Sequence, residues 1–138
     1  MEKISLKALI PALPLQIYDA WLEGRKHTEM TGSRATGYAK EGKDFTAWDG
    51  YITGKNVELV DGKKIVQSWR ASEFAEGAPD SKLEITFKRL KGGTQVTINH
   101  SNIPDGMGAG YKKGWIDYYF KPMTKYFTDK AKAKKDKF

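Results

Sequence analysis

Two histidines are the side chains of this sequence best suited to acid–base chemistry. A nucleophilic site needs a serine or cysteine beside a histidine and an acid, and the chain contains no cysteine and only His27 and His100. His27 lies in a charged segment, which indicates a surface residue. His100 follows Val96 and Ile98 at two-residue spacing, which predicts an inward side chain. It could be a base or bind a ligand, but a core histidine bonded to a neighbouring backbone group is favoured.

Metal and phosphate chemistry have no support in the sequence. A zinc site normally needs three or four Cys, His or carboxylate ligands, and no such cluster occurs. Gly106, Gly108 and Gly110 lie close together, but no strand directly precedes them and no Lys-Ser or Lys-Thr follows. We interpret them as a flexible loop before the last helix that gates access to the interior. We therefore expect no cofactor, no metal, no catalytic residue and no enzymatic activity.

Arg70 is a further candidate for ligand contact, next to Trp69. Strand alternation points it away from the buried face, so pairing with a surface carboxylate is the favoured interpretation. A bulge in the sheet would instead let it reach a ligand carboxylate.

The segment from Tyr111 to Lys130 must position any such site, because it carries the clearest helical pattern. Large side chains recur there at intervals of three and four, the spacing of one apolar face of a helix: Trp115, Tyr118, Tyr119, Pro122, Met123, Tyr126 and Phe127. Burial of each large apolar side chain contributes roughly 1.5–3 kcal/mol, enough for this helix to anchor a domain. Pro122 lacks the N–H for a helical bond, so we expect a bend there.

The first part of the chain predicts one strand and two short helices. Apolar residues alternate with Ser5 and Lys7 between Ile4 and Ile10, as in a strand with one buried face. A helix follows from Pro14, with Gly24 as its expected end. A second short helix is expected over 25–31.

Three turn signals then predict an antiparallel meander. They are Asp49-Gly50, Asp61-Gly62 and Gly92-Gly93, and Asp-Gly favours a type I′ turn, which needs positive φ at both central residues. The expected hairpins pair 45–48 with 51–59, 51–59 with 64–74, and 81–90 with 94–100. Alternation gives the sheet one buried face, containing Phe45, Ala47, Ile52, Ile65, Gln67, Trp69, Ala71, Leu83, Ile85, Phe87, Val96, Ile98 and His100. Trp48 and Tyr51 are expected on the outer face beside Thr46 and Thr53. The last helix is expected to cover the buried face.

The charge distribution argues against specific nucleic-acid binding. The net charge is +7, but residues 121–138 hold seven lysines and two aspartates, so the excess lies at the chain end. We expect a single domain over 1–138, with a folded core at about 3–130 and a lysine-rich tail at 131–138. No apolar run approaches about 18 residues and the N-terminus lacks a secretory pattern, so a cytoplasmic protein without a membrane span is expected.

Several motifs together resemble the activator of heat shock protein 90 ATPase homologue family. They are FTAWDGYITG at 45–54, IVQSWR at 65–70, Pro79-Asp80-Ser81, Ile103-Pro104, and Gly114-Trp115 with Tyr118-Tyr119. Their order and spacing extend the resemblance from about Ile4 to about Phe127. It implies an α+β, START-like helix-grip fold: a curved antiparallel sheet around a long C-terminal helix, with two short helices after the first strand. Such folds often leave a cavity between the sheet and the helix.

The resemblance also implies functions. In eukaryotic members this domain follows a separate N-terminal domain, and the pair stimulates the chaperone's ATPase, whereas we expect a stand-alone domain here. Stand-alone members look like binding domains for small ligands or partners. A co-chaperone-type regulator of the heat shock protein 90 ATPase is therefore the alternative function, and a small-molecule hydrolase or cyclase is the least favoured one.

Our leading hypothesis is a non-catalytic domain that binds a hydrophobic small molecule or a protein partner between sheet and helix. The expected cavity residues are Phe45, Gln67, Trp69, Phe87, His100, Trp115, Tyr119 and Met123. Trp48 and Tyr51 are the expected contact patch for a protein partner.

Overall fold

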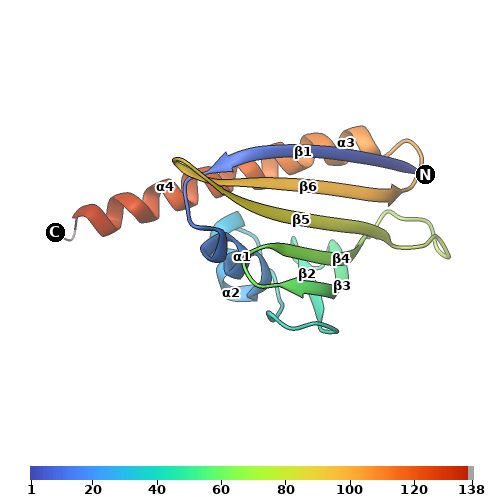
Figure 1. Ribbon diagram of the computed structural model, residues 1–138. Coiled ribbons are helices and arrows are strands. Elements are labelled where there is room, and N and C mark those ends of the chain that lie inside the picture. The colour runs from blue at the N-terminus through green and yellow to red at the C-terminus, as the bar shows by residue number, and fades with distance from the viewer. Residues whose placement is uncertain (137–138) are drawn as a thin grey trace.

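A six-stranded antiparallel sheet is the larger layer of the computed structural model, which describes residues 1–136 (Figure 1). The strand order is β1-β6-β5-β4-β3-β2, so the first strand lies beside the last. The strands are β1 (Glu2–Ile10), β2 (Asp44–Ala47), β3 (Ile52–Val60), β4 (Lys64–Ala71), β5 (Ser81–Leu90) and β6 (Gly93–Ile103). The expected meander and hairpin pairings are confirmed.

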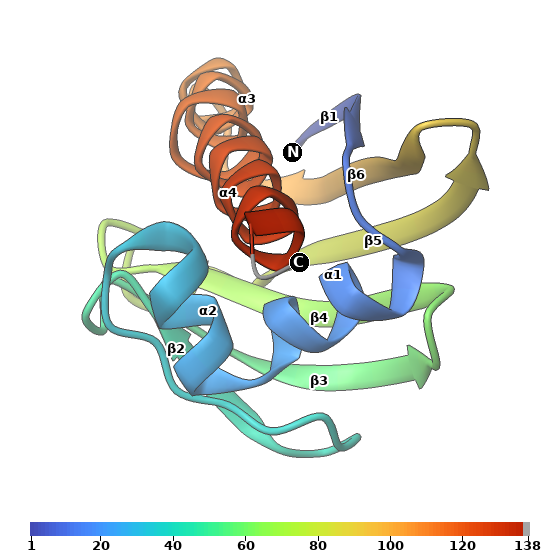
Figure 2. The same ribbon diagram turned by 90° about the vertical axis from the view of Figure 1, so that its left-hand side faces the viewer.

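The helices lie on the concave side of this sheet. They are α1 (Pro14–Leu22), α2 (Gly24–Thr31), α3 (Gly108–Trp115) and α4 (Lys121–Asp136), with a π-helical turn, η1 (Ile116–Phe120), joining the last two. Figure 2 looks along α3 and α4 and shows the sheet curving around them. The α+β helix-grip arrangement is confirmed.

Alternation along the strands sets which side chains meet the helical layer. Three adjacent strands, β4, β5 and β6, each contribute one fully buried isoleucine to the inner face: Ile65, Ile85 and Ile98. From the other layer, Met123 and Phe127 are buried against the same core. The last helix is therefore the lid of the sheet's apolar face, as its spacing predicts.

The turns differ in type from the expected type I′ form. Loop 48–51 has four residues, and Trp48, Asp49 and Gly50 all have positive φ. Loop 61–63 has three residues, and only Gly62 has positive φ. A type I′ hairpin requires a two-residue loop, so the Asp-Gly signal located both turns but assigned the wrong geometry.

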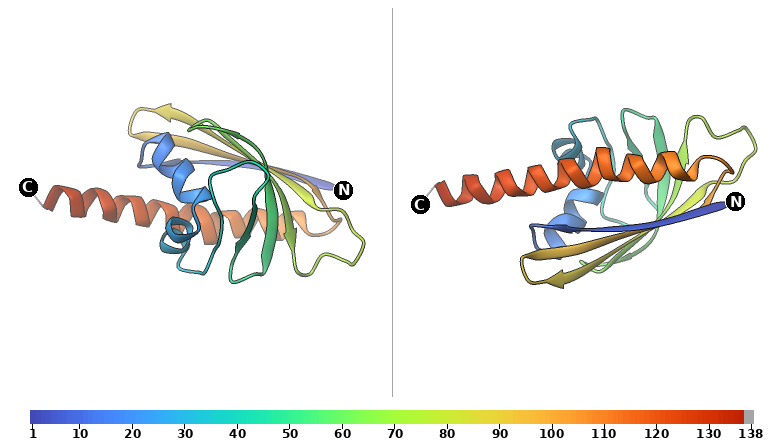
Figure 3. Two further views of the ribbon diagram at one scale, coloured as in Figure 1. Left: turned by 90° about the horizontal axis from the view of Figure 1, so that it is seen from below. Right: turned by 90° about the horizontal axis from the view of Figure 1, so that it is seen from above.

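The last helix changes register at η1. Lys121 donates its backbone N–H to the Ile116 carbonyl, five residues back, immediately before Pro122, which has no N–H to donate. The wider turn moves the apolar stripe: Phe120 is buried, whereas Tyr118 is 61% exposed. The expected burial of Tyr118 is therefore wrong. The helix nevertheless continues as one rod, and the irregularity is a wide turn in place of a sharp bend (Figure 3).

The glycine-rich segment before α3 is held from β1. The Glu2 carboxylate accepts the backbone N–H groups of Gly106 and Gly108, at 3.0 and 2.7 Å. These two bonds hold the pKa of Glu2 below its usual value. Because α3 already begins at Gly108, the flexible loop expected over 106–110 is wrong.

The lysine-rich end belongs to α4 as far as Asp136, and the rest of the expected tail lies outside the described residues. Within residues 1–136, no helix is both long and apolar enough to cross a membrane.

Candidate functional site

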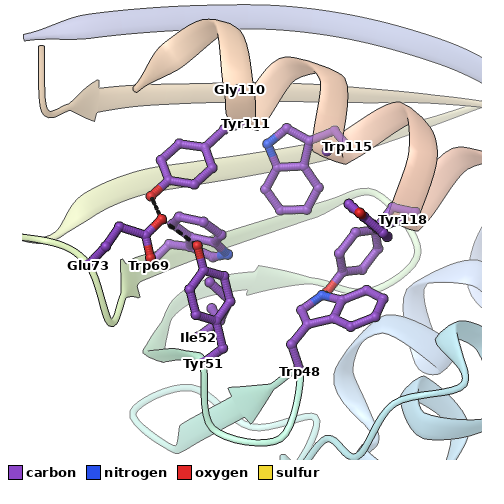
Figure 4. A pocket seen from close by; sticks show the side chains of 11 residues that line it. Trp48, Tyr51, Ile52, Trp69, Glu73, Gly110, Tyr111, Trp115 and Tyr118 are labelled. Carbon is purple, nitrogen blue, oxygen red and sulfur yellow. Dashed lines mark hydrogen bonds between the residues drawn. The ribbon is translucent and has the colours of Figure 1, made fainter. Parts of the chain in front are cut away.

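A hollow lies between loop 48–51, the adjoining sheet and the first turns of the last helix (Figure 4). Its volume is about 600 Å³. Its walls consist of seven aromatic side chains, one aliphatic side chain, one carboxylate and two glycines: Trp48, Tyr51, Trp69, Tyr111, Trp115, Tyr118, Tyr119, Ile52, Glu73, Gly110 and Gly114. We call this hollow the aromatic pocket.

Helix spacing places one wall of the aromatic pocket. Tyr111, Trp115 and Tyr119 follow one another at four-residue intervals and so share a face of α3 and η1. Gly110 and Gly114 flank them on the same helix, and a Cβ at Gly110 would meet no atom within 4 Å. Gly110 therefore leaves open space where a larger side chain would narrow the pocket, whereas a Cβ at Gly114 would touch Tyr118 at 3.8 Å.

Glu73 forms a polar cluster with two tyrosines of the pocket. Its Oε1 atom accepts the Tyr111 hydroxyl at 2.6 Å and also accepts the Tyr51 hydroxyl. Partial burial alone would raise the pKa of Glu73, but the bonds from Tyr111 and Tyr51 hold it below its usual value. Burial and the bond to Glu73 raise the pKa of Tyr51 to about 12 and raise that of Tyr111 as well. At neutral pH the cluster is one carboxylate with two protonated phenols.

A chain of hydrogen bonds fixes Trp48 and Tyr119 in the wall. The Trp48 indole N–H donates to the Tyr119 hydroxyl at 3.2 Å, and that oxygen lies 2.9 Å from His27 Nε2. His27 Nδ1 lies 2.7 Å from the Trp21 carbonyl oxygen, which can only accept, so the proton is on Nδ1. Nε2 then accepts the Tyr119 O–H, and each group in the chain has a partner.

His27 is buried, so the expected surface position is wrong. Burial lowers its pKa, which keeps the ring neutral. The charged neighbours of His27 indicated a solvent-exposed position, but these neighbours lie on the other faces of a short helix. The face that carries His27 packs against the last helix, as its bond to Tyr119 requires.

His100 points inward, as predicted, and is fully buried. Trp115 donates its indole N–H to Nδ1 at 3.2 Å, so the ring proton is on Nε2 and is donated to Ser81 Oγ at 2.8 Å. Ser81 in turn donates to the Trp69 carbonyl at 2.6 Å. The expected bond from the ring to a backbone group is wrong, because both ring nitrogens pair with side chains, those of Ser81 and Trp115. Burial lowers the pKa of His100 to about 4.

Of the eight expected cavity residues, Trp69, Trp115 and Tyr119 line the aromatic pocket. The other five lie elsewhere: Gln67, His100, Phe87 and Met123 are buried in the core, and Phe45 packs on Gly54. Gln67, for example, donates to the buried Asn56 at 2.9 Å. Strand parity identifies the inner face, but the packing of α1 and the last helix decides which part of that face stays open.

Trp48 and Tyr51 also line the pocket, so their expected place on the outer face is wrong. Both belong to loop 48–51, where consecutive left-handed residues turn the backbone and strand alternation no longer applies. Tyr51 remains 41% exposed at the mouth.

Several pocket residues were not expected from the sequence. They are Ile52, Glu73, Gly110, Tyr111, Gly114 and Tyr118. Tyr111 lies four residues before Trp115, so helical spacing could have found it. Glu73 lies in the connection after β4, and no sequence pattern assigns a loop carboxylate to a pocket.

Arg70 points away from the pocket, as alternation predicts. It pairs with Asp80 at 3.2 Å and donates to the carbonyls of Ala75 and Ala78 at 2.9 and 2.6 Å. It therefore holds the connection between β4 and β5. Among residues 1–136, no group of three His, Cys, Asp or Glu side chains is placed to hold a metal ion.

The chain is similar to proteins that activate a chaperone ATPase. It is 29% identical over 125 residues to the human "Activator of 90 kDa heat shock protein ATPase homolog 1", covering 91% of this chain and 37% of that protein. It is 33% identical over 115 residues to the Dictyostelium discoideum "Activator of 90 kDa heat shock protein ATPase homolog", covering 83% of this chain and 30% of that one. The chain thus spans about a third of the length of these relatives.

The fold has a counterpart in a crystal structure of an HSP90 activator from Plasmodium falciparum. The TM-score is 0.78 at 23% identity, over 87% of this chain and 91% of that one. The family model described as "Activator of Hsp90 ATPase homolog 1-like protein" matches residues 11–128. The chain therefore belongs to the family of Activator of Hsp90 ATPase homolog 1-like proteins.

Proposed function

We propose that this protein is a non-catalytic binding domain whose aromatic pocket takes a hydrophobic small molecule. The observation that carries the proposal is the hollow of about 600 Å³ walled by seven aromatic side chains. Small-molecule sites typically have volumes of roughly 300–1,000 Å³, apolar walls and a few polar groups, and this pocket matches each of these features.

The walls are organised before any ligand arrives. Hydrogen bonds hold Trp48 through Tyr119 and hold Trp115 through His100, so these rings lose little freedom when a ligand binds. Less of the free energy of burial is then spent on ordering side chains. Apolar burial contributes about 25 cal/mol per Å², so a fixed aromatic wall favours a flat or chain-like apolar ligand.

The hydrogen bonding of both histidines supports a non-catalytic role. Each ring nitrogen of His27 and of His100 already has a partner within the protein. Neither ring offers a free nitrogen to a substrate, so neither is available as a general base. A hydrolase or cyclase is accordingly the least supported function.

A ligand panel with graded apolar size tests the proposal. Indole, 2-naphthol and medium-chain alcohols are titrated while the indole ¹⁵N–¹H signals of the four tryptophans are followed. Binding in the pocket should shift the signals of Trp48, Trp69 and Trp115 and leave that of Trp21, which is donated to Gln67, nearly unchanged. Equal shifts at all four signals, or none with any compound, would rule the proposal out.

A second candidate function is regulation of the heat shock protein 90 ATPase. It is favoured by the family match and by the names of the relatives, although the chain corresponds to only about a third of their length. Tyr51 and Tyr118 are 41% and 61% exposed beside the pocket mouth, and together with Trp48 they form an aromatic surface that a protein could contact.

An ATPase assay with the chaperone from the same organism tests this second candidate. The wild-type chain should raise ATP turnover, and Tyr118→Ala should weaken the effect because an exposed contact ring is lost. Unchanged turnover together with no complex in a pull-down would remove this candidate.

A further inference from the structure

Among the described residues that line the aromatic pocket, Glu73 is the one with a charged side chain. Within residues 1–136, no lysine or arginine forms an ion pair with it, although the chain carries a net charge of +7. The nearby helix carries Lys112, which is exposed, and Lys113, whose side chain is 80% exposed and pairs with Asp117 at 2.8 Å. The pocket therefore holds a negative charge whose contacts in the protein are phenols, not a cation.

The hydrogen bonds of the Glu73 cluster leave acceptors facing a ligand. Tyr51 and Tyr111 both give their hydroxyl protons to Glu73, so their phenolic oxygens retain only lone pairs. A ligand that approaches the mouth meets a carboxylate and two oxygen acceptors. Such a mouth repels an anion and is complementary to a group that donates hydrogen bonds and carries positive charge.

The indole N–H groups add one donor at most. Those of Trp48 and Trp115 are already donated to Tyr119 and His100, at 3.2 Å each. That of Trp69 has no partner among residues 1–136 and can hold one acceptor atom of a ligand.

The aromatic walls reinforce the preference for positive charge. The face of an aromatic ring is negative, and rings within about 6 Å attract a cation, most strongly when water is excluded. Trp69 packs on Trp115 with their centroids 5.7 Å apart, and Trp48 packs on Tyr118 at 5.6 Å, so each pair forms a continuous aromatic wall beside the hollow. Figure 4 shows these side chains and Tyr111 surrounding the hollow beside Glu73.

We propose, building on the binding function above, that the aromatic pocket takes a hydrophobic organic amine. The ammonium group lies at Glu73, where the phenolic oxygens of Tyr51 and Tyr111 accept its remaining N–H bonds. The apolar body lies between Trp48, Trp115 and Tyr118.

Three probes of similar size separate the effect of charge from that of hydrophobicity: 4-phenylbutylamine, 4-phenylbutanol and 4-phenylbutyrate. Each is titrated at pH 7 by calorimetry, and the Trp48 and Trp115 indole signals show whether it enters the pocket. The amine should bind about tenfold more tightly than the alcohol, and the carboxylate should bind more weakly than either. Raising the ionic strength should reduce the preference for the amine without affecting the alcohol.

Glu73→Gln is the decisive variant, because glutamine can still accept the tyrosine hydroxyls but has no charge. The amine should lose its tenfold advantage, and the affinity of the alcohol should stay within about twofold. Glu76→Gln is the matched control, since Glu76 is exposed in the same connection and does not line the pocket. It should leave all three affinities unchanged.

The outcomes distinguish the two proposals. If the amine and the alcohol bind equally, or if Glu73→Gln still prefers the amine, the inference about charge is wrong. The proposal that the pocket binds a hydrophobic molecule is then unaffected. If no probe shifts the pocket tryptophans, the proposed binding function fails as well.

Discussion

Trp48 and Tyr119 are joined in the wall of the aromatic pocket by a hydrogen bond of 3.2 Å from the indole N–H to the phenolic oxygen. One residue comes from a hairpin loop of the sheet and the other from the last helix, so the bond ties the two layers together at the pocket wall. Behind it, His27 anchors the phenol from α2 at 2.9 Å. Three parts of the chain thus meet at one buried hydroxyl.

Removing that hydroxyl should destabilise the protein. Tyr119→Phe leaves His27 Nε2 buried without a donor and Trp48 without an acceptor, so the free energy of unfolding should fall by about 1–3 kcal/mol. Urea denaturation measures this change. Tyr118→Phe is the control, because Tyr118 is 61% exposed, and it should cost less than about 0.5 kcal/mol. Equal losses of unfolding free energy in the two variants would show that the buried hydrogen bonds of Tyr119 contribute nothing to stability.

Stability should depend on pH through the two buried histidines. Burial lowers the pKa of His100 to about 4 and lowers that of His27, whereas the unfolded chain binds these protons below about pH 6.5. The unfolded state therefore binds more protons below about pH 6.5, down to about pH 4 in the case of His100, and the free energy of unfolding falls as the pH decreases through this window. The expected slope is up to about 1.4 kcal/mol per pH unit for each histidine.

Denaturation at pH 7.5, 6.0 and 5.0 tests this slope above the range where most carboxylates titrate. His100→Gln should lower stability at every pH and also reduce the slope, since one of the two titrating groups is gone. A wild-type stability that is flat from pH 7 to 5 would contradict the neutral state of the buried rings.

Filling the aromatic pocket from the helix should block it without unfolding the protein. A side chain at Gly110 meets no atom near its Cβ, and leucine has a higher helix propensity than glycine by up to about 1 kcal/mol. Gly110→Leu should therefore keep or raise the melting temperature and weaken probe binding at least tenfold. Ala109→Leu changes an exposed neighbour on the same helix that does not line the pocket, and it should leave binding intact.

Removing the hydrogen bonds between β1 and the start of α3 should make that end of the helix more mobile. Glu2→Ala removes the acceptor of the Gly106 and Gly108 N–H groups, so hydrogen exchange at these two amides should become faster. The neighbouring exposed substitution Lys3→Ala should leave their exchange unchanged. Exchange that stays slow in Glu2→Ala would show that other contacts hold this turn.

Local pattern in the sequence determined most of the fold. Two-residue alternation and turn signals fix strands and their inner face because side chains on a strand alternate strictly, as the burial of Ile65, Ile85 and Ile98 confirms. Spacing of three and four similarly located the last helix. The π-helical turn was missed, because a one-residue shift of register before Pro122 leaves no mark in an apolar pattern.

The site was decided by tertiary structure. The sequence alone supplied Trp69, Trp115 and Tyr119, which follow from strand and helix periodicity. It could not place Trp48, whose loop backbone leaves the strand pattern, or Glu73, which reaches the pocket from the β4–β5 connection. Periodicity reports which face of an element points inward, but whether that face meets solid packing or a hollow depends on how separate elements dock. That docking is set by contacts between residues far apart in the chain, which no local pattern records.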